Sequence, residues 1–230
     1  MKKRLKPSKP TKGKVAHAAT RSVLSAIPWI GGTAVELFNA VVSPPLEKRR
    51  DEWREEIGQA LQRLEREKGI DLKALGDNPA FIDTVLQATQ VALRDSQEEK
   101  RRALRNAILN AALPAAPDQS LQQMFLNYID TFTVWYLRLL KLFNDPRGWA
   151  QANNHRFPDL YSGELSTILE SAYPELRGKR DLYDQVWKDL YLRGLVNTEG
   201  LYGIMTGGGL MQSRTTESGK CFLAFIEEPR

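Results

Sequence analysis

The sequence has few of the residues that build metal or catalytic sites. Its 230 residues include two histidines, His17 and His155, and a single cysteine, Cys221. A lone cysteine excludes an intramolecular disulfide and fits a reducing compartment. The metal-ligand spacings H-E-x-x-H and C-x-x-C are absent, and so is the G-x-S-x-G of a serine nucleophile. We therefore expect no metal, no cofactor, no catalytic residues and no small-molecule substrate.

Two short fragments match part of a nuclease site but lack its setting. Asp71-Leu72-Lys73 and Glu98-Glu99-Lys100 have the acid-x-Lys pattern. Both lie in or beside predicted helices, with no β-sheet to hold them. An enzyme is therefore the least favoured of the function classes that we consider.

A long apolar run is also missing. The longest uncharged run near the start, Ser22 to Val35, has 14 residues, whereas a bilayer span needs about 20. His17 and Arg21 interrupt the place where the apolar part of a secretory signal would lie. We expect a cytoplasmic protein, either free or peripheral to the inner membrane.

The positive charge is concentrated at the N-terminus. The net charge is +5, and seven basic residues lie within 1–14 with no acidic residue among them. Residues 156–230 hold nine basic and eleven acidic residues, a net charge of −2. We predict that 1–13 is a disordered tail, either solubilising or attracted to anionic membranes and phosphate backbones. The candidate anion contacts are Lys2, Lys3, Arg4, Lys6, Lys9, Lys12 and Lys14.

An apolar segment follows the tail and is predicted to form a helical hairpin. Pro28 ends its first helix, and Thr33 with Glu36 forms a capping box for the second. We expect a stop at Pro44-Pro45. The hairpin is interpreted mainly as buried core, and alternatively as an exposed element that inserts into a membrane. Its candidate residues are Ile27, Pro28, Trp29, Ile30, Gly31, Gly32, Leu37 and Phe38.

Apolar spacing of three and four residues predicts a helical bundle over 14–143. The clearest helix runs from Leu46 to Lys68, and Asn78-Pro79 gives a cap followed by proline at the first helical position. Further helices are expected over 98–113, after Asp118 and after Thr133. The polar, proline-containing segment 144–161 is interpreted as a linker.

The pattern over 162–230 resembles a winged helix domain. Two helices, 163–172 and 179–193, precede β-prone runs around glycines 203 and 207–209, and the triple glycine is interpreted as a flexible wing tip. A final helix carries T-x-x-G-x-x-F-L from Thr216 to Leu223. The fold class is therefore mainly α, a multi-helix bundle followed by a small winged-helix-like α+β domain. Such a domain implies possible nucleic-acid contacts at Lys179, Arg180, Lys188, Arg193 and Arg214.

The first part of the chain resembles bacterial abortive-infection proteins of the alpha type. The resemblance rests on the Pro/Gly-broken segment from Ile27 to Arg50 and on LQQMFLNYIDTFTVWYLRLLKLF, Leu121 to Phe143. It implies a role in phage defence and supplies no catalytic residues.

Two function hypotheses remain. The first is an interaction or effector protein that contacts a protein partner or an anionic membrane surface. The second is a winged-helix DNA-binding regulator. The −2 charge of 156–230 favours the first, because phosphate contacts dominate DNA affinity.

Overall fold

The computed structural model describes residues 33–229, with side chains from residue 46 onward. The chain divides into two compact units, 1–52 and 53–230, which are described separately. The basic tail and the hairpin residues 27–32 lie outside the described residues, and so does the predicted turn at Gly31 and Gly32. Leu37 and Phe38 lie in helix α2 (Thr33–Lys68), where only the backbone is described.

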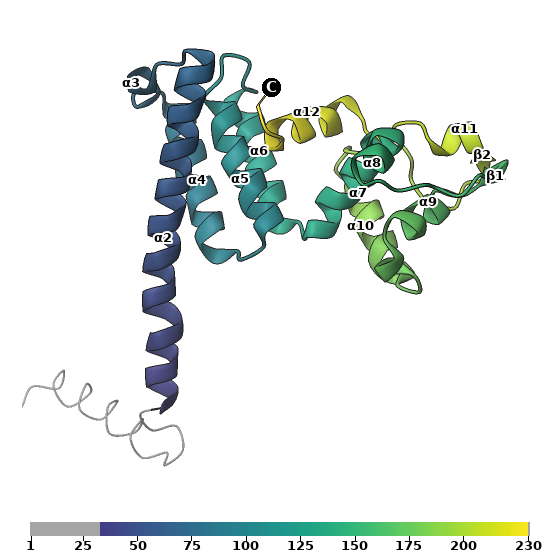
Figure 1. Ribbon diagram of the computed structural model, residues 1–230, viewed down its shortest axis with the longest axis horizontal. Helices are drawn as coiled ribbons and strands as arrows, with labels where there is room; N and C mark the ends of the chain where they lie inside the picture. Colours follow the sequence, from purple (N-terminus) through teal and green to yellow (C-terminus); the bar gives the residue numbers. More distant parts are fainter. Residues whose placement is uncertain (1–32, 230) are drawn as a thin grey trace, which may run out of the picture. The chain divides into compact units, whose positions relative to one another are not determined.

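Helix α2 corrects the predicted stop at Pro44-Pro45. It runs continuously from Thr33 to Lys68 through both prolines (Figure 1). The fixed φ of proline is compatible with a helix, and each proline removes one backbone donor without reversing the chain. The described part of the first unit is therefore the start of this helix, which includes an ion pair between Lys48 and Glu52 at 3.6 Å.

In the second unit, short connections link the helices that follow α2. These are α3 (Leu72–Leu75), α4 (Pro79–Arg94), α5 (Glu98–Ala111), α6 (Gln119–Thr131), α7 (Val134–Asn144) and α8 (Pro146–Ala152). The predicted cap at Asn78 is confirmed, because its side chain accepts hydrogen bonds from the backbone at the start of α4, and Asp118 caps α6 in the same way. The predicted capping box of Thr33 and Glu36 lies where only the backbone is described. The helix α8 lies within the segment interpreted as a linker.

Helix α5 is the centre of this part. Leu104, Ala107 and Ile108 are fully buried, as their spacing predicts, and α5 packs against α4, α6 and α12. Apolar spacing predicts a wide buried face on α4 that includes Ile82 and Leu86, but both are exposed, so the buried face is narrower.

The remaining elements are β1 (Ser162–Gly163), α9 (Leu165–Ala172), the 3-10 helix η1 (Pro174–Leu176), α10 (Arg180–Leu192), β2 (Met205–Thr206), α11 (Gly207–Leu210) and α12 (Glu217–Ile226). The two strands pair antiparallel, Ser162 with Thr206 and Gly163 with Met205. The chain is thus mainly helical with a small two-stranded sheet, as expected.

The glycine-rich segment does not form the expected wing tip. Gly207 to Gly209 begin α11, which Thr206 caps, and β2 pairs with β1 rather than with a neighbouring strand of a hairpin. An isolated antiparallel bridge joins Val196 to Thr215. The backbone approach of Gly207 explains the difference, because its N–H donates to the Tyr161 carbonyl at 2.9 Å.

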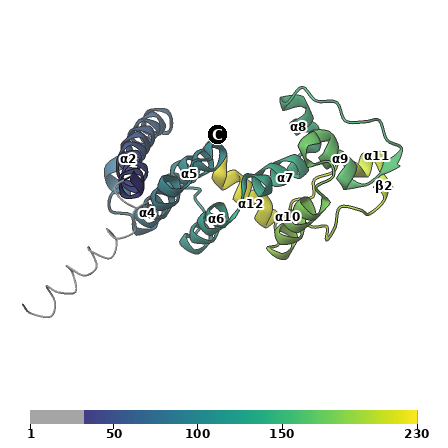
Figure 2. The ribbon, with the colours of Figure 1, turned by 90° about the horizontal axis from the view of Figure 1, so that it is seen from below.

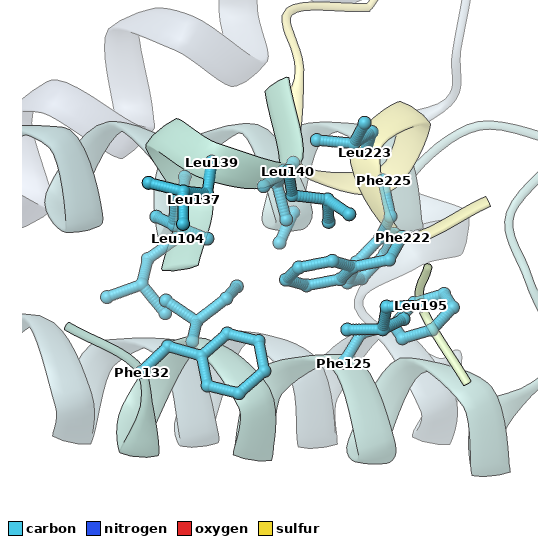
Figure 3. Packing of buried hydrophobic residues seen from close by; sticks show 14 of the residues in the cluster. Leu104, Phe125, Phe132, Leu137, Leu139, Leu140, Leu195, Phe222, Leu223 and Phe225 are labelled. Carbon is cyan, nitrogen blue, oxygen red and sulfur yellow. The ribbon is translucent and has the colours of Figure 1, made fainter. Parts of the chain in front are cut away.

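Helix α12 packs against helices that precede it in the sequence. It lies beside α5 and α7 in both views (Figures 1 and 2). Its Phe222 and Phe225 pack with Phe125 of α6, at ring centroid distances of 5.3 and 5.8 Å, and leucines of α7 complete this core (Figure 3). Two asparagines of α5 also hold the end of α12: Asn106 donates to the Ile226 carbonyl, and Asn110 to the carbonyls of Phe225 and Glu227.

Residues 53–230 therefore form one compact unit by contact, although α8 to α12 follow a different pattern from α4 to α7. The division of this region at 144–161 stays a prediction.

Candidate functional site

Helix α10 is held firmly on one side. Tyr183, Val186, Trp187 and Leu190 are buried. The Trp187 indole donates to the Thr198 carbonyl at 2.9 Å, and its ring packs edge-on against Phe143 at 4.9 Å. These contacts fix α10 in position, so the residues on its solvent-exposed face have a fixed arrangement.

That outer face borders a groove of about 300 Å³ between α10 and the loop that follows it. Two apolar side chains stand out at the groove: Leu192 is 70% exposed and Tyr191 is 38% exposed. We call this the α10 groove; its lining residues are Asp184, Trp187, Lys188, Tyr191, Leu192, Glu199, Gly200, Leu201 and Tyr202.

Asp184 organises one wall of the α10 groove. It accepts a hydrogen bond from the Tyr202 hydroxyl at 2.5 Å and one from Arg180 Nε at 3.4 Å. The Arg180 guanidinium also lies 3.9 Å from the centre of the Tyr202 ring. Burial and the hydrogen bond to Asp184 raise the pKa of Tyr202, so it stays a neutral donor. Asp184, Arg180 and Tyr202 are therefore paired with one another in this wall.

The opposite side of α10 carries a second aromatic contact. Arg193 lies over the rings of Tyr128 and Phe132, at 5.1 and 5.2 Å from their centres. Tyr136 stacks on Phe132 and donates to Asp189 at 2.7 Å. Burial and that hydrogen bond raise the pKa of Tyr136 to about 12. These contacts attach α10 to α6 and α7.

The five residues predicted to contact nucleic acid are not brought onto one face. Lys179 and Lys188 are exposed. Positions 180 and 193 lie about 140° apart around the helix axis, and each arginine contacts an aromatic ring on its own side. Arg214 is half-buried: its Nη2 donates to the Gly209 carbonyl and lies 3.0 Å from Met205 Sδ. Arg214 therefore holds α11 in place, and a contact between these residues and DNA stays a prediction.

Sequence reasoning missed the residues that form the α10 groove. Apolar spacing along α10 predicts an inner stripe of Leu182, Val186 and Leu190, but Leu182 is exposed, and Tyr183 is buried and donates to Glu170. Tyr191 and Leu192 directly follow Leu190, the last leucine of that stripe. Two apolar residues beyond the stripe were therefore the sequence signal that could have indicated an exposed apolar surface. Nothing local indicated Tyr202, which lies in a separate loop.

Comparisons with known proteins give no family or relative. No family model, no curated protein and no solved structure matches the chain. Among the described residues, no helix is long and apolar enough to cross a membrane. Within the same residues, no three histidine, cysteine or acidic side chains gather as a metal site would require.

Proposed function

We propose that this chain acts without catalysis, by binding a protein partner through the α10 groove. The observation that carries the proposal is the exposure of Leu192 and Tyr191 beside a groove lined by Trp187, Leu201 and Tyr202. Buried aromatic and aliphatic anchors supply most of the binding energy at protein interfaces. A partner that inserts one apolar side chain here would cover surface that the fold leaves exposed.

The charges at this surface favour protein over DNA. Arg180, which contacts the Tyr202 ring of the groove wall, forms an ion pair with Asp184 at 3.4 Å. Lys188 lies in a groove that also contains Glu199 and Asp184. A DNA-binding helix needs an excess of basic residues toward the phosphates, and α10 lacks that excess here. DNA binding by the winged-helix-like part is the second candidate function.

The basic residues of 2–14 give the proposal its membrane component. Seven lysine and arginine side chains near anionic lipid contribute on the order of 1 kcal/mol each. The tail would attach the chain to the membrane surface while the α10 groove binds the partner. Phage defence, which the sequence resemblance implies, is the setting that we propose for this pair of contacts.

The proposal is tested by placing a photo-reactive phenylalanine at position 192 in cells that naturally express the protein. We expect one protein to be cross-linked in quantity. The purified partner should then bind the chain directly, and Leu192→Ser combined with Tyr191→Ser should weaken that binding at least tenfold, because the apolar anchors are lost.

The matched control places the same photo-reactive residue at Gln123, an exposed position on α6. Equal cross-linking from both positions, or an affinity unchanged by the double substitution, would contradict the proposal. Mobility shifts with duplex DNA at two salt concentrations test the second candidate. Tight binding that weakens steeply with salt and is lost in Lys179→Ala with Lys188→Ala would establish DNA binding instead. Liposome flotation with and without 1–13 tests the membrane component.

A further inference from the structure

A second groove lies away from α10, where the chain enters β1 and where α11 begins. Its volume is about 940 Å³. Figure 1 shows β1, β2 and α11 together at this place. We call it the β1 groove; it is lined by Arg147, Arg156, Phe157, Pro158, Asp159, Leu160, Tyr161, Thr206, Gly207, Gly208, Leu210 and Met211. The proposed function leaves this groove without a role.

Tyr161 is presented to solvent on a fixed backbone. Its side chain is 96% exposed, although its carbonyl accepts a hydrogen bond from Gly207 N at 2.9 Å. Four residues earlier, Phe157 is anchored against His155, with 4.8 Å between the ring centres. The aromatic ring of Tyr161 is therefore exposed on a backbone that is fixed at its carbonyl, and its faces are open for stacking.

The charge of the β1 groove is locally positive. Arg147 and Arg156 line it with one acidic residue, Asp159. Among the described residues, neither arginine is within ion-pair distance of a carboxylate. Both guanidinium groups are thus available to an outside anion, in contrast to Arg180 and Arg138, which are paired.

Gly207 and Gly208 line the groove with backbone alone, and we call this part its floor. A Cβ at Gly207 would lie 2.0 Å from the Leu160 carbonyl oxygen, so this close approach requires glycine. A Cβ at Gly208 would meet nothing within 4 Å and would project into open space. A flat ring can approach the backbone at Gly208, because that position carries no side chain.

We propose that the β1 groove binds single-stranded nucleic acid, with a base stacked on Tyr161 and neighbouring phosphates at Arg147 and Arg156. An exposed aromatic ring beside cationic side chains is the combination that sequence-tolerant single-strand binding uses. An acidic peptide would satisfy the arginines but leave the tyrosine ring unused. A duplex keeps its bases stacked inside, and a free nucleotide would be poorly enclosed by a fully exposed ring.

The test measures fluorescence anisotropy of labelled oligo-dT and oligo-rU, each twelve nucleotides long, with the full chain at several salt concentrations. Tyr161→Ala should weaken binding roughly tenfold, because one base loses its stacking partner. Arg147→Ala with Arg156→Ala should reduce the dependence of log affinity on log salt by about 1.4, since two phosphate contacts are lost. Gly208→Leu should also weaken binding by filling the floor.

Two features of the design separate the groove from the basic tail. The tail is present in every variant, and Tyr161→Ala changes no charge, so a tenfold loss cannot come from the tail. Gly203→Leu is the matched control for Gly208→Leu, because Gly203 also has open space around its Cβ but does not line the groove. Equal melting temperatures would show that all variants are folded.

Three results would overturn the proposal. In the first, Tyr161→Ala binds as tightly as Gly203→Leu, which would assign all binding to the tail. In the second, a duplex of the same length binds equally well with the same response to Tyr161→Ala. In the third, polyglutamate displaces the oligonucleotide from wild type and from Tyr161→Ala equally, which would make the groove a general anion surface.

Discussion

The two parts of the second unit are stabilised in different ways. In α4 to α6 the buried positions repeat every three or four residues, and the core side chains of α5 share the packing among several helices. In α9 to α12 the buried side chains are accompanied by single close backbone contacts, in which a glycine passes a carbonyl or a threonine caps a short helix. Repeated packing distributes stability over many residues, whereas close backbone contacts concentrate it at a few positions.

The largest effect is expected at Gly219, within T-x-x-G-x-x-F-L. Thr216 caps α12 by accepting from Gly219 N at 3.0 Å, and a Cβ at Gly219 would lie 2.2 Å from the Leu195 carbonyl oxygen. Gly219→Ala should therefore cost about 3 kcal/mol and lower the melting temperature by roughly 6–12 °C, because backbone must move to relieve the overlap. Differential scanning calorimetry measures both quantities.

Gly208→Ala is the control, since its Cβ would meet nothing within 4 Å. It should change the free energy of unfolding by less than about 1 kcal/mol, with a gain favoured because alanine suits a helix better than glycine. Equal losses of stability for both substitutions would show that the close backbone contact at Gly219 does not concentrate stability there.

The next effect is expected where the two parts meet. Asn110 donates to the carbonyls of Phe225 and Glu227 at 3.0 and 2.8 Å, at the end of α12 where backbone acceptors lack helical partners. Asn110→Ala should cost about 2 kcal/mol in urea unfolding, because these carbonyls lose their donor. Asn110→Asp should cost more at pH 7, since a carboxylate then faces carbonyl oxygens at a helix C-terminus.

Asn127 provides the comparison residue for Asn110. It is an exposed asparagine on α6 whose side chain accepts from Gln87. Asn127→Ala should change stability by less than about 0.5 kcal/mol. A similar small loss for Asn110→Ala would mean that α12 is held by its aromatic side chains alone.

The sequence predicted the distributed part well and the concentrated part poorly. The spacing of Leu104, Ala107 and Ile108 indicated their burial correctly, because helical periodicity is a local property of the chain. The glycines at 207–209 were interpreted as a wing tip, since the carbonyl that Gly207 approaches belongs to Leu160, far away in the sequence. The α10 groove was missed for the same reason, as Tyr202 reaches Asp184 from a separate loop.

The smallest effect concerns an ion pair that connects α5, in the distributed part, to α7. Arg138 of α7 donates to Glu99 of α5 through Nε at 3.0 and 3.1 Å, and its guanidinium lies 4.9 Å from the centre of the Trp135 ring. The hydrogen bond from Arg138 lowers the pKa of Glu99 below its ordinary value of 4.5, against an opposing effect of burial.

A carboxylate whose pKa is lowered by folding stabilises the fold when the pH is above its pKa in the unfolded chain. That stability is lost as the pH falls through its pKa in the folded chain. Glu99→Gln should therefore cost about 1 kcal/mol at pH 7, given that both side chains are about one-third exposed, and the difference from wild type should shrink as the pH falls below 4.5.

Urea unfolding at pH 7, 5, 4 and 3 measures this dependence. Glu98→Gln removes the same charge from an exposed neighbouring position, and it should change the free energy of unfolding by less than about 0.5 kcal/mol at pH 7. A Glu99→Gln loss that stays constant down to pH 3 would mean that the side chain contributes through packing against α7 rather than through its charge. In that case even this polar contact between α5 and α7 would contribute through packing, and the contrast with the glycine-dependent part would be sharper.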